Sequence, residues 1–376
     1  MKKILFITGT RADYGKLKPL MKAVEKHDDF ELYVYVSGMH VIEKFGGTYN
    51  EVLKDNYKNV FVAFGVVHSE NMSVNLGNMI CDLTGYAQHV KPDLIVVHGD
   101  RIDALCGAVV GAFNNIMVAH IEGGEVSGTI DDSIRHAISK FAHLHFVSNH
   151  EAKQRLIQLG EGSNDIHVIG SPDIDIMISE TLPSIAEAKS RYDIKFDNYG
   201  IFMFHPVTTE YKEIGEKVEI IMEALKESGR NFIAIYPNND TGSDIILNQL
   251  WQEEGNQNFA LYSSIRFEYF LTFLKNAQFI IGNSSAGVRE SCVYGVPSID
   301  IGSRQNGRYD SSVLKNIVHV NENKNEILDA LNNIENKATH AFQFGDGKSK
   351  DKFMKVIMDE EIWERNLQKT FVDLSD

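Results

Sequence analysis

Three acidic residues lie where short apolar segments end or where the next helix begins. Asp100 follows the apolar run 93–98, Glu122 follows the run 116–120, and Asp131 opens a helix predicted at 130–141. Apolar runs that alternate with helices predict a parallel sheet, whose ligands bind at the carboxyl ends of the strands. Any one of these acids could be a solvated surface group, but three on one rim favour general acid–base chemistry.

The start of that helix allows more than one interpretation of its acids. Residues 129–132 resemble a capping box, which would place Asp132 at the helix N-terminus. Asp131 would then point into the site, with Arg135, one turn further on, as its ion-pair partner. The histidines of the chain are spread singly, so we expect no metal site.

A second group of residues has the chemistry to bind an anion. The sequence GNSSAG is a hydroxyl-rich turn before a predicted helix, so Ser284 and Ser285 either hold a diphosphate or simply cap that helix. Ala286 stands where a nucleophile elbow requires Gly, which excludes that motif. His205 ends a predicted strand and could hold phosphate oxygens in its protonated form, although a lone histidine is more often structural.

Arginines add to this group, although the chain as a whole is acidic. The strand-to-helix turn TGTRADYG could cradle a phosphate at the helix start, or its glycines could serve only to turn the chain. Arginine in the loops of an acidic protein favours a small anionic ligand. The arginines predicted at the rim are Arg11, Arg101, Arg289, Arg304 and Arg308.

Composition restricts the class of protein further. The 376 residues carry a net charge of −15 and no basic run, which argues against nucleic acid as a partner. The three cysteines are isolated, as is typical of buried thiols in a reducing cytosol. The N-terminal apolar run is too short for a signal peptide, and no run reaches membrane-spanning length. We therefore expect a cytoplasmic protein with no membrane partner.

The order of the predicted elements divides the chain into two α/β domains. Strands alternate with helices until the segment 171–188, which carries two prolines and no predicted strand, and the alternation resumes near Tyr199. We predict an N-terminal domain at 1–175 and a C-terminal domain at 176–359. A C-terminal amphipathic helix at about 360–376 is expected to pack back on the first domain. Each domain is predicted to be a doubly wound parallel sheet.

Seven motifs occur in order along nearly the whole chain and resemble one family. They are GTRADYGKLKPLM, HGDRIDAL, HIEGGEVSGTIDDSIRH, HPVTTE, YPNNDTG, IGNSSAGVRE and GSRQNGR. The set is similar to the hydrolysing UDP-N-acetylglucosamine 2-epimerases of bacterial sialic-acid biosynthesis. The resemblance implies a GT-B fold, with two Rossmann-like domains and the active site in the cleft between them.

The implied reaction converts UDP-N-acetylglucosamine (UDP-GlcNAc) and water to N-acetylmannosamine (ManNAc) and UDP. UDP is first eliminated to leave a glycal, and water then adds to the anomeric carbon. No cofactor is expected. The resemblance also implies a homodimer or homotetramer.

The resemblance assigns roles to residues by their positions in these motifs. Those matched to the chemistry are Asp100, Glu122, Asp131 and His205. Those matched to UDP and sugar binding are Arg11, Arg101, Asn238, Ser284, Ser285, Glu290 and Arg304. Glu290 would accept hydrogen bonds from the ribose, and Arg135 and Asp175 would have supporting roles.

Other functions share parts of this pattern. A hydrolysing epimerase of a UDP-linked 2,4-diacetamido-2,4,6-trideoxy sugar, as in legionaminic-acid synthesis, would differ in how one pocket treats carbons four and six. The non-hydrolysing epimerase usually has GTRPE in its first loop and arginines after the second-domain histidine, whereas this chain has GTRADYG and HPVTT. A retaining glycosyltransferase usually carries a second Glu where Gly282 stands. The presence of all three acids disfavours a catalytically dead sensor.

Overall fold

The computed structural model describes residues 1–69, 71–127, 130–179 and 181–373. The chain divides into two compact units. Unit 1 comprises Met1–Glu125, Asp131–Ile178 and Gln343–Asp376, and unit 2 comprises Val126–Ile130 and Ser179–Phe342. Thr129, the first residue of the predicted capping box, lies outside the described residues.

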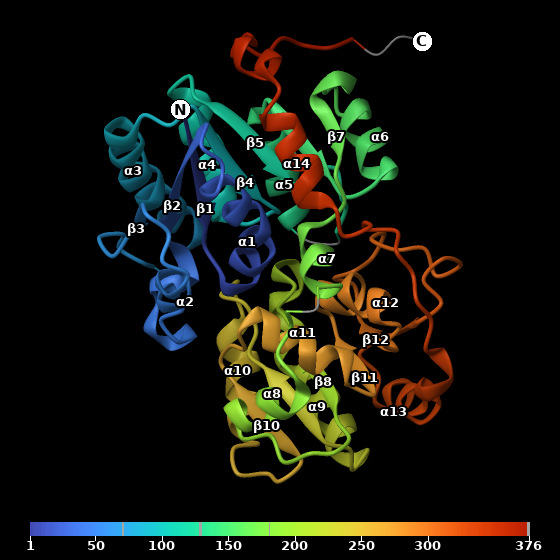
Figure 1. Ribbon diagram of the computed structural model, residues 1–376. Coiled ribbons are helices and arrows are strands. Elements are labelled where there is room, and N and C mark those ends of the chain that lie inside the picture. Colours follow the sequence, from blue (N-terminus) through green and yellow to red (C-terminus); the bar gives the residue numbers. More distant parts are fainter. Residues whose placement is uncertain (70, 128–129, 180, 374–376) are drawn as a thin grey trace. The chain divides into compact units, whose positions relative to one another are not determined.

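Parallel strands form the sheet of unit 1 in the order β3-β2-β1-β4-β5-β6-β7 (Figure 1). The strands are β1 (Lys2–Thr8), β2 (Phe30–Val36), β3 (Val60–Val62), β4 (Leu94–His98), β5 (Met117–Ile121), β6 (Leu144–Val147) and β7 (Ile166–Val168). The strand order reverses between β1 and β4, and ligands of such sheets bind at the carboxyl ends near this reversal. The predicted doubly wound sheet is confirmed.

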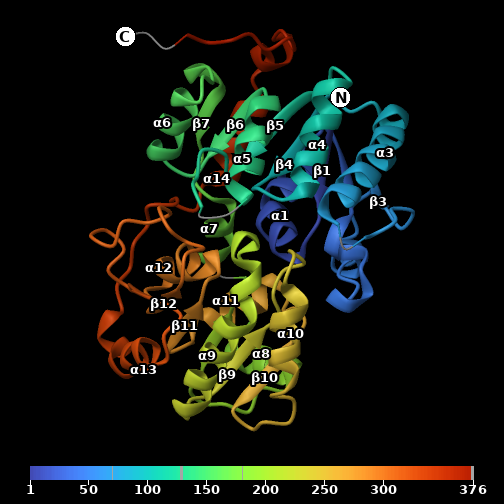
Figure 2. The ribbon, with the colours of Figure 1, turned by 180° about the vertical axis from the view of Figure 1, so that it is seen from behind.

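Helices cover both faces of this sheet. They are α1 (Arg11–Glu25), α2 (Tyr49–Lys54), α3 (Met72–Val90), α4 (Ile102–Phe113), α5 (Ile130–Phe141), α6 (His150–Gln158), α7 (Pro172–Met177) and α14 (Ser349–Ile357). Ile4 and Phe6 of β1 belong to the core shared with α1 and α14, whereas Leu5 and Ile7 belong to the core shared with α3 and α4 (Figures 1 and 2). Burial on both faces explains why these strands are apolar at nearly every position.

Unit 2 repeats this architecture with the strand order β10-β9-β8-β11-β12-β13, again all parallel. The strands are β8 (Gly200–Met203), β9 (Phe232–Ile235), β10 (Phe259–Tyr262), β11 (Phe279–Gly282), β12 (Ser298–Ile301) and β13 (Ile317–Val320). The helices are α8 (Ile185–Tyr192), α9 (Ile214–Glu227), α10 (Ser243–Trp251), α11 (Phe267–Lys275), α12 (Glu290–Tyr294) and α13 (Lys324–Asn333). Apolar residues of α9, α10 and α13 bury one face of the sheet.

The C-terminal part of the chain differs from the prediction. The chain returns to unit 1 at Gln343 and not near position 360, and the helix that packs on unit 1 is α14. Phe353 and Ile357 of α14 are fully buried in the core, and the Phe353 ring lies 4.9 Å from the ring of Phe146. Within the described part of the predicted helix, residues 360–373, only a short 3-10 turn forms, at Glu360–Glu364. The amphipathic helix that packs on unit 1 therefore lies at Ser349–Ile357, before the predicted range 360–376.

The segment 171–188, for which no strand was predicted, contains α7 and the start of α8. Pro172 is the first residue of α7, where a missing N–H has no cost, and Ser184 begins α8 through a capping box with Glu187. Within the described ranges, no helix is both long enough and apolar enough to cross a membrane.

Candidate active site

Glu122 adopts a backbone conformation that few non-glycine residues take. It directly follows β5, and its φ of 64° lies in the left-handed region. Its backbone N–H donates to the carbonyl oxygen of Phe146 on β6 at 2.9 Å, which ties this conformation to the sheet. Such strain costs on the order of 1 to 3 kcal/mol and persists mainly at functional sites.

The Glu122 carboxylate lies between two side chains of unit 1. The Ser171 hydroxyl donates to Oε1 at 2.5 Å, and Nε2 of His98 lies 3.3 Å from Oε2. His98 ends β4 in register with Ile121, so the strand ladder itself places the imidazole beside the carboxylate. A buried carboxylate with a hydroxyl on one oxygen and an imidazole at the other has the surroundings of a general acid or base.

Asp100 forms an ion pair with Arg135 of α5. The Arg135 side chain is only 2% exposed. Its Nη1 lies 3.0 Å from Oδ1 of Asp132 and donates to the carbonyl oxygen of Glu125 at 3.1 Å. Asp132, predicted as a helix cap, is thus an ion-pair partner of Arg135, and Arg135 supports Asp100 directly.

Asp131 and Asp175 lie on different helices of unit 1. Asp131 is half-buried in the first turn of α5. Asp175 lies on α7, and its carboxylate accepts the backbone N–H groups of Ser349 at 2.9 Å and Lys350 at 2.8 Å. Asp175 therefore caps α14, and its predicted supporting role in the site stays a prediction. Burial raises the pKa of Asp175 despite these hydrogen bonds.

His120 connects the loops that carry Asp100 and Glu122. Its Nε2 lies 2.8 Å from the carbonyl oxygen of Gly99, and its Nδ1 lies 3.0 Å from Oγ of Ser139. Since a carbonyl only accepts, Nε2 carries the proton and Ser139 donates to Nδ1. A side chain at Gly123 would lie 2.9 Å from Nδ1, so glycine is needed where this loop passes the ring. His120 was not among the site residues predicted from the sequence.

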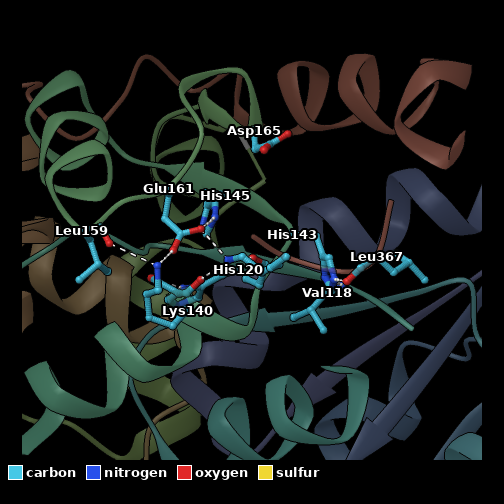
Figure 3. A network of polar contacts seen from close by, with 12 residues as sticks. Val118, His120, Lys140, His143, His145, Leu159, Glu161, Asp165 and Leu367 are labelled. Carbon is cyan, nitrogen blue, oxygen red and sulfur yellow. Dashed lines mark hydrogen bonds and ion pairs between the residues drawn. The ribbon is translucent and has the colours of Figure 1, made fainter. Parts of the chain in front are cut away.

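Unit 1 also holds a cluster of polar contacts around the buried carboxylate of Glu161, which Figure 3 shows. Glu161 accepts from Lys140 at 2.7 Å and Lys369 at 2.6 Å, and it lies 3.1 Å from Nε2 of His145. Burial acts to raise the pKa of Glu161, but these bonds outweigh it and lower the pKa to about 2. Lys369 also donates to the carbonyl oxygen of Ser139 at 3.2 Å, so the C-terminal segment is anchored on unit 1.

Burial lowers the pKa of His120 to about 3, against 6.5 for an ordinary histidine. Between these values only the unfolded chain binds the proton, so the stabilisation is complete above pH 6.5 and is lost as the pH falls towards 3. Glutamine binds no proton in either state. We therefore expect His120→Gln to reduce the slope of the unfolding free energy against pH, between pH 6 and 4, by about 1.4 kcal/mol per pH unit. Urea denaturation followed by circular dichroism at several pH values measures this slope.

His89→Gln is the matched control, because the exposed His89 at the end of α3 meets water in both states. It should leave the slope unchanged. Equal slopes for His120→Gln and the unsubstituted protein would show that His120 does not bind its proton differently in the two states.

In the turn after β1, backbone N–H groups donate to side chains of the same turn. The Asp13 carboxylate accepts the N–H groups of Gly9 at 3.0 Å and Thr10 at 2.9 Å, and the Thr10 hydroxyl accepts the N–H of Asp13 at 3.2 Å. This capping box engages the N–H groups of Gly9, Thr10 and Asp13 within the chain. A phosphate cradle at this turn stays a prediction. Arg11 has its Nη2 3.8 Å from Oε1 of Glu51.

Arg101 lies beside a buried acid at the start of α4. Asp103 of this helix is buried and accepts the Ser37 hydroxyl at 3.0 Å. Burial raises the pKa of Asp103, and the positive charge of Arg101 opposes that rise. Arg101 therefore stabilises this helix start in addition to any role in anion binding.

In unit 2, His205 follows β8 and has a defined tautomer. The backbone N–H of Asn238 donates to Nδ1 of His205 at 3.0 Å. Because Nδ1 accepts, the ring carries its proton on Nε2 and is neutral in this arrangement. The protonated ring predicted from the sequence is not what this hydrogen bond favours, but Nε2–H remains a donor for a phosphate oxygen.

Asn283 makes hydrogen bonds to several residues around His205. Its Oδ1 accepts the backbone N–H of His205 at 2.7 Å, and its Nδ2 donates to the carbonyl oxygen of His205 at 2.8 Å. Its own carbonyl oxygen accepts from Nη1 of Arg304 at 3.3 Å and from Nε2 of Gln305 at 2.7 Å. Asn283 directly follows the end of β11 but was not among the site residues predicted from the sequence.

Ser284 and Glu290 occupy the next turn of the chain. The Ser284 hydroxyl accepts the N–H of Ala286 at 3.3 Å, which confirms that it caps a helix. The capped element is a short 3-10 turn, Ser285–Gly287, and α12 begins only at Glu290. Glu290 is buried.

The structure thus brings the predicted residues together in two groups, one in each unit. In unit 1 these are Asp100, Glu122 and Arg135, to which it adds His98, His120 and Ser171. In unit 2 these are His205, Asn238, Ser284 and Arg304, to which it adds Asn283 and Gln305. Among the residues that the structure describes, no three His, Cys, Asp or Glu side chains form a group that could hold a metal ion.

Two parallel α/β units of this kind occur in proteins with the GT-B fold. The structure superposes on the crystal structure of Methanocaldococcus jannaschii UDP-GlcNAc 2-epimerase in complex with UDP-GlcNAc and UDP with a TM-score of 0.79. The two sequences are 22% identical, and the match covers 95% of this chain and 99% of the other. The fold is therefore GT-B, as predicted.

Sequence comparison gives the family. The model of the UDP-N-acetylglucosamine 2-epimerase family matches residues 22–358, so the chain belongs to this family. It is 47% identical over 380 residues to the UDP-N-acetylglucosamine 2-epimerase of Neisseria meningitidis serogroup B, which covers 100% of both chains. The chain is therefore an enzyme of the UDP-GlcNAc 2-epimerase type.

Two further relatives have names other than UDP-N-acetylglucosamine 2-epimerase. The UDP-N,N'-diacetylbacillosamine 2-epimerase (hydrolyzing) of Legionella pneumophila is 30% identical, with 95% of this chain and 96% of that protein covered. The polysialic acid biosynthesis protein P7 of Escherichia coli is 32% identical, with 88% and 86% covered.

Proposed function

We propose that the protein is a hydrolysing 2-epimerase that converts UDP-GlcNAc and water to ManNAc and UDP for sialic-acid synthesis. The observation that carries this proposal is the Glu122 carboxylate, buried in a strained backbone conformation between Ser171 and His98. Inverting carbon two requires a proton to leave one face of the sugar and another to arrive on the opposite face. Two differently placed acid–base groups are needed, and unit 1 supplies Glu122 and, with Arg135 beside it, Asp100.

The proposed first step removes UDP from the sugar. A carboxylate takes the proton from carbon two, the carbon–carbon double bond forms, and the bond to the anomeric oxygen breaks with its electron pair going to UDP. Negative charge then grows on the diphosphate, where donors in unit 2 can stabilise it. We assign this role to Nε2–H of His205, to Arg304 and to the turn at Ser284 and Ser285, with Glu290 accepting from the ribose.

The proposed second step adds water to the glycal. Water bonds to the anomeric carbon, and carbon two takes a proton from an acid on the face opposite to the one first deprotonated. The proton that water loses goes to a carboxylate and replaces the one given to carbon two, and the proton first taken from carbon two is released with UDP, so every acid–base group ends in its starting protonation state. We assign Asp131 to this acid–base set together with Asp100 and Glu122.

Names of relatives support the substrate and the hydrolytic outcome. The relative with 47% identity is named for UDP-N-acetylglucosamine, and a relative named as hydrolyzing is 30% identical over 95% of the chain. The polysialic acid protein of E. coli supports the link to sialic acid. The alternative substrate is the UDP-linked diacetamido sugar that the Legionella relative is named for. The homodimer or homotetramer implied by the motifs stays a prediction.

We expect incubation with UDP-GlcNAc alone to yield free ManNAc and UDP. Proton NMR of the sugar products measures this, and UDP release is followed on the same samples by phosphorus NMR. Recovery of UDP-N-acetylmannosamine as the stable product would assign the chain to the non-hydrolysing class. Turnover of the UDP-linked diacetamido sugar with none of UDP-GlcNAc would favour the alternative substrate.

A further inference from the structure

We propose that Asn283 is a positioning residue that holds the diphosphate-binding groups of unit 2 in a single arrangement. The inference rests on the proposed function, because it takes His205, Arg304 and Ser284 as the groups that meet the diphosphate. Asn283 is only 1% exposed, so its polar atoms serve protein contacts. It would act through these neighbours and would not touch the substrate.

The position of Asn283 follows from the sheet. Gly282 pairs with Met203 in the β8–β11 ladder, and a Cβ at Gly282 would lie 2.0 Å from the carbonyl oxygen of Met203. Glycine therefore lets the two strands approach closely at their carboxyl ends. Asn283 continues the ladder by donating its backbone N–H to that same carbonyl oxygen at 3.0 Å. Its side chain is thereby directed to the residues that follow Met203.

Beyond the last paired residues of β8 and β11, the side-chain amide of Asn283 makes the hydrogen bonds that a further strand residue would make. One side-chain oxygen accepts from the N–H of His205, and one side-chain nitrogen donates to the carbonyl of the same residue. Both backbone groups of His205 are fixed by a single planar amide, and Asn238 fixes the ring through Nδ1. The direction in which Nε2–H points is therefore set by hydrogen bonds that begin at Asn283.

The backbone of Asn283 joins a second loop to this arrangement. Its carbonyl oxygen accepts from Gln305, which is also 1% exposed, and from Nη1 of Arg304. The next residue, Ser284, begins the 3-10 turn. Three segments far apart in sequence thus depend on the placement of one residue, which is what pre-organised recognition of a charged group requires.

The test is Asn283→Asp, which keeps the size and the acceptor but replaces the donor with a second carboxylate oxygen facing the carbonyl of His205. Loss of one buried hydrogen bond and repulsion between two oxygens should weaken UDP binding by roughly 10- to 100-fold. Isothermal titration calorimetry with UDP and with uridine measures the effect. Uridine lacks the diphosphate, so its affinity should change much less.

Asn316→Asp is the matched control in the same unit. Asn316 is fully buried, and its amide donates to the carbonyl oxygen of Val296 at 3.0 Å, so the substitution creates a similar repulsion at a residue without a proposed role. UDP affinity should survive this change. If the control loses as much UDP affinity as Asn283→Asp, or if uridine and UDP weaken equally, Asn283 serves the general fold and the inference fails.

A second variant tests the same inference if Asn283→Asp does not fold. Gln305→Met keeps the side-chain length and removes the donor to the carbonyl of Asn283, and we expect it to weaken UDP binding by roughly 3- to 10-fold. Unchanged UDP affinity in Gln305→Met, or in a folded Asn283→Asp, would overturn the positioning role. Failure of the unsubstituted protein to bind UDP would contradict the proposed function itself, which keeps the two failures distinct.

Discussion

Glu122→Gln should lower turnover by roughly 100- to 10,000-fold and leave UDP affinity nearly unchanged. The amide keeps the shape and can still accept from the Ser171 hydroxyl, but it cannot take up or release a proton beside His98. The proposed UDP contacts of unit 2 are not altered. Steady-state kinetics and calorimetry with UDP measure the two parts of this prediction.

Heavy water shows which half of the reaction Glu122 serves. A variant blocked in the elimination step should release no glycal and incorporate no deuterium at carbon two. A variant blocked in the addition step should release the glycal together with UDP. Either result is compatible with an acid–base role, whereas normal turnover of Glu122→Gln would show that the carboxylate is structural.

Glu125→Gln is a closely matched control for this experiment. Glu125 lies three residues further along the same loop, is also buried, and accepts a serine hydroxyl, that of Ser148, at 2.8 Å. The proposed mechanism gives its side chain no proton to move. A loss of turnover as large as that of Glu122→Gln would mean that any buried carboxylate in this loop is needed for folding.

The sequence predicted the framework of the site well, because helical and strand periodicity is a local property. The predicted helix 130–141 coincides with α5. It is twelve residues long and is flanked by apolar strands. The short strands β3, β10 and β13, of three or four residues each, carry too few positions to show alternation and were missed.

The contacts within the site are set by tertiary structure and could not be predicted in the same way. Ser171 meets Glu122 across 49 positions of sequence, and Asn283 meets His205 across 78. One signal was available: Ser171 and Asn283 each lie just beyond a strand end, as the predicted acids do. Arg135 was identified, but only the fold shows that its guanidinium reaches Asp100 across 35 positions.

Replacement of Arg135 by Met is expected to damage both stability and turnover. The guanidinium is almost fully buried, whereas the side chains of Asp100 and Asp132 are 22% and 27% exposed. Its removal leaves two neighbouring carboxylates without this counter-charge and leaves the carbonyl oxygen of Glu125 without this donor. Because water can still reach both carboxylates, we expect a loss of roughly 2 kcal/mol, below the range for a wholly buried pair.

Turnover of Arg135→Met should fall by roughly 100-fold or more, since a misplaced acid loses the alignment that proton transfer needs. UDP affinity should change little, because the proposed diphosphate contacts belong to the other unit. Lys195→Met is the control: Lys195 pairs at 3.5 Å with Asp193, the two side chains are 81% and 86% exposed, and such surface pairs contribute little. It should retain both stability and turnover.

Arg135→Lys separates the charge of Arg135 from its geometry. Lysine keeps the positive charge, but a single ammonium cannot reproduce the fork that holds Asp100 through Nη2 and Asp132 through Nη1. Stability measured by urea denaturation should therefore recover more than turnover does. If lysine restores full turnover, charge alone is sufficient, and the proposed alignment of Asp100 by the guanidinium is wrong.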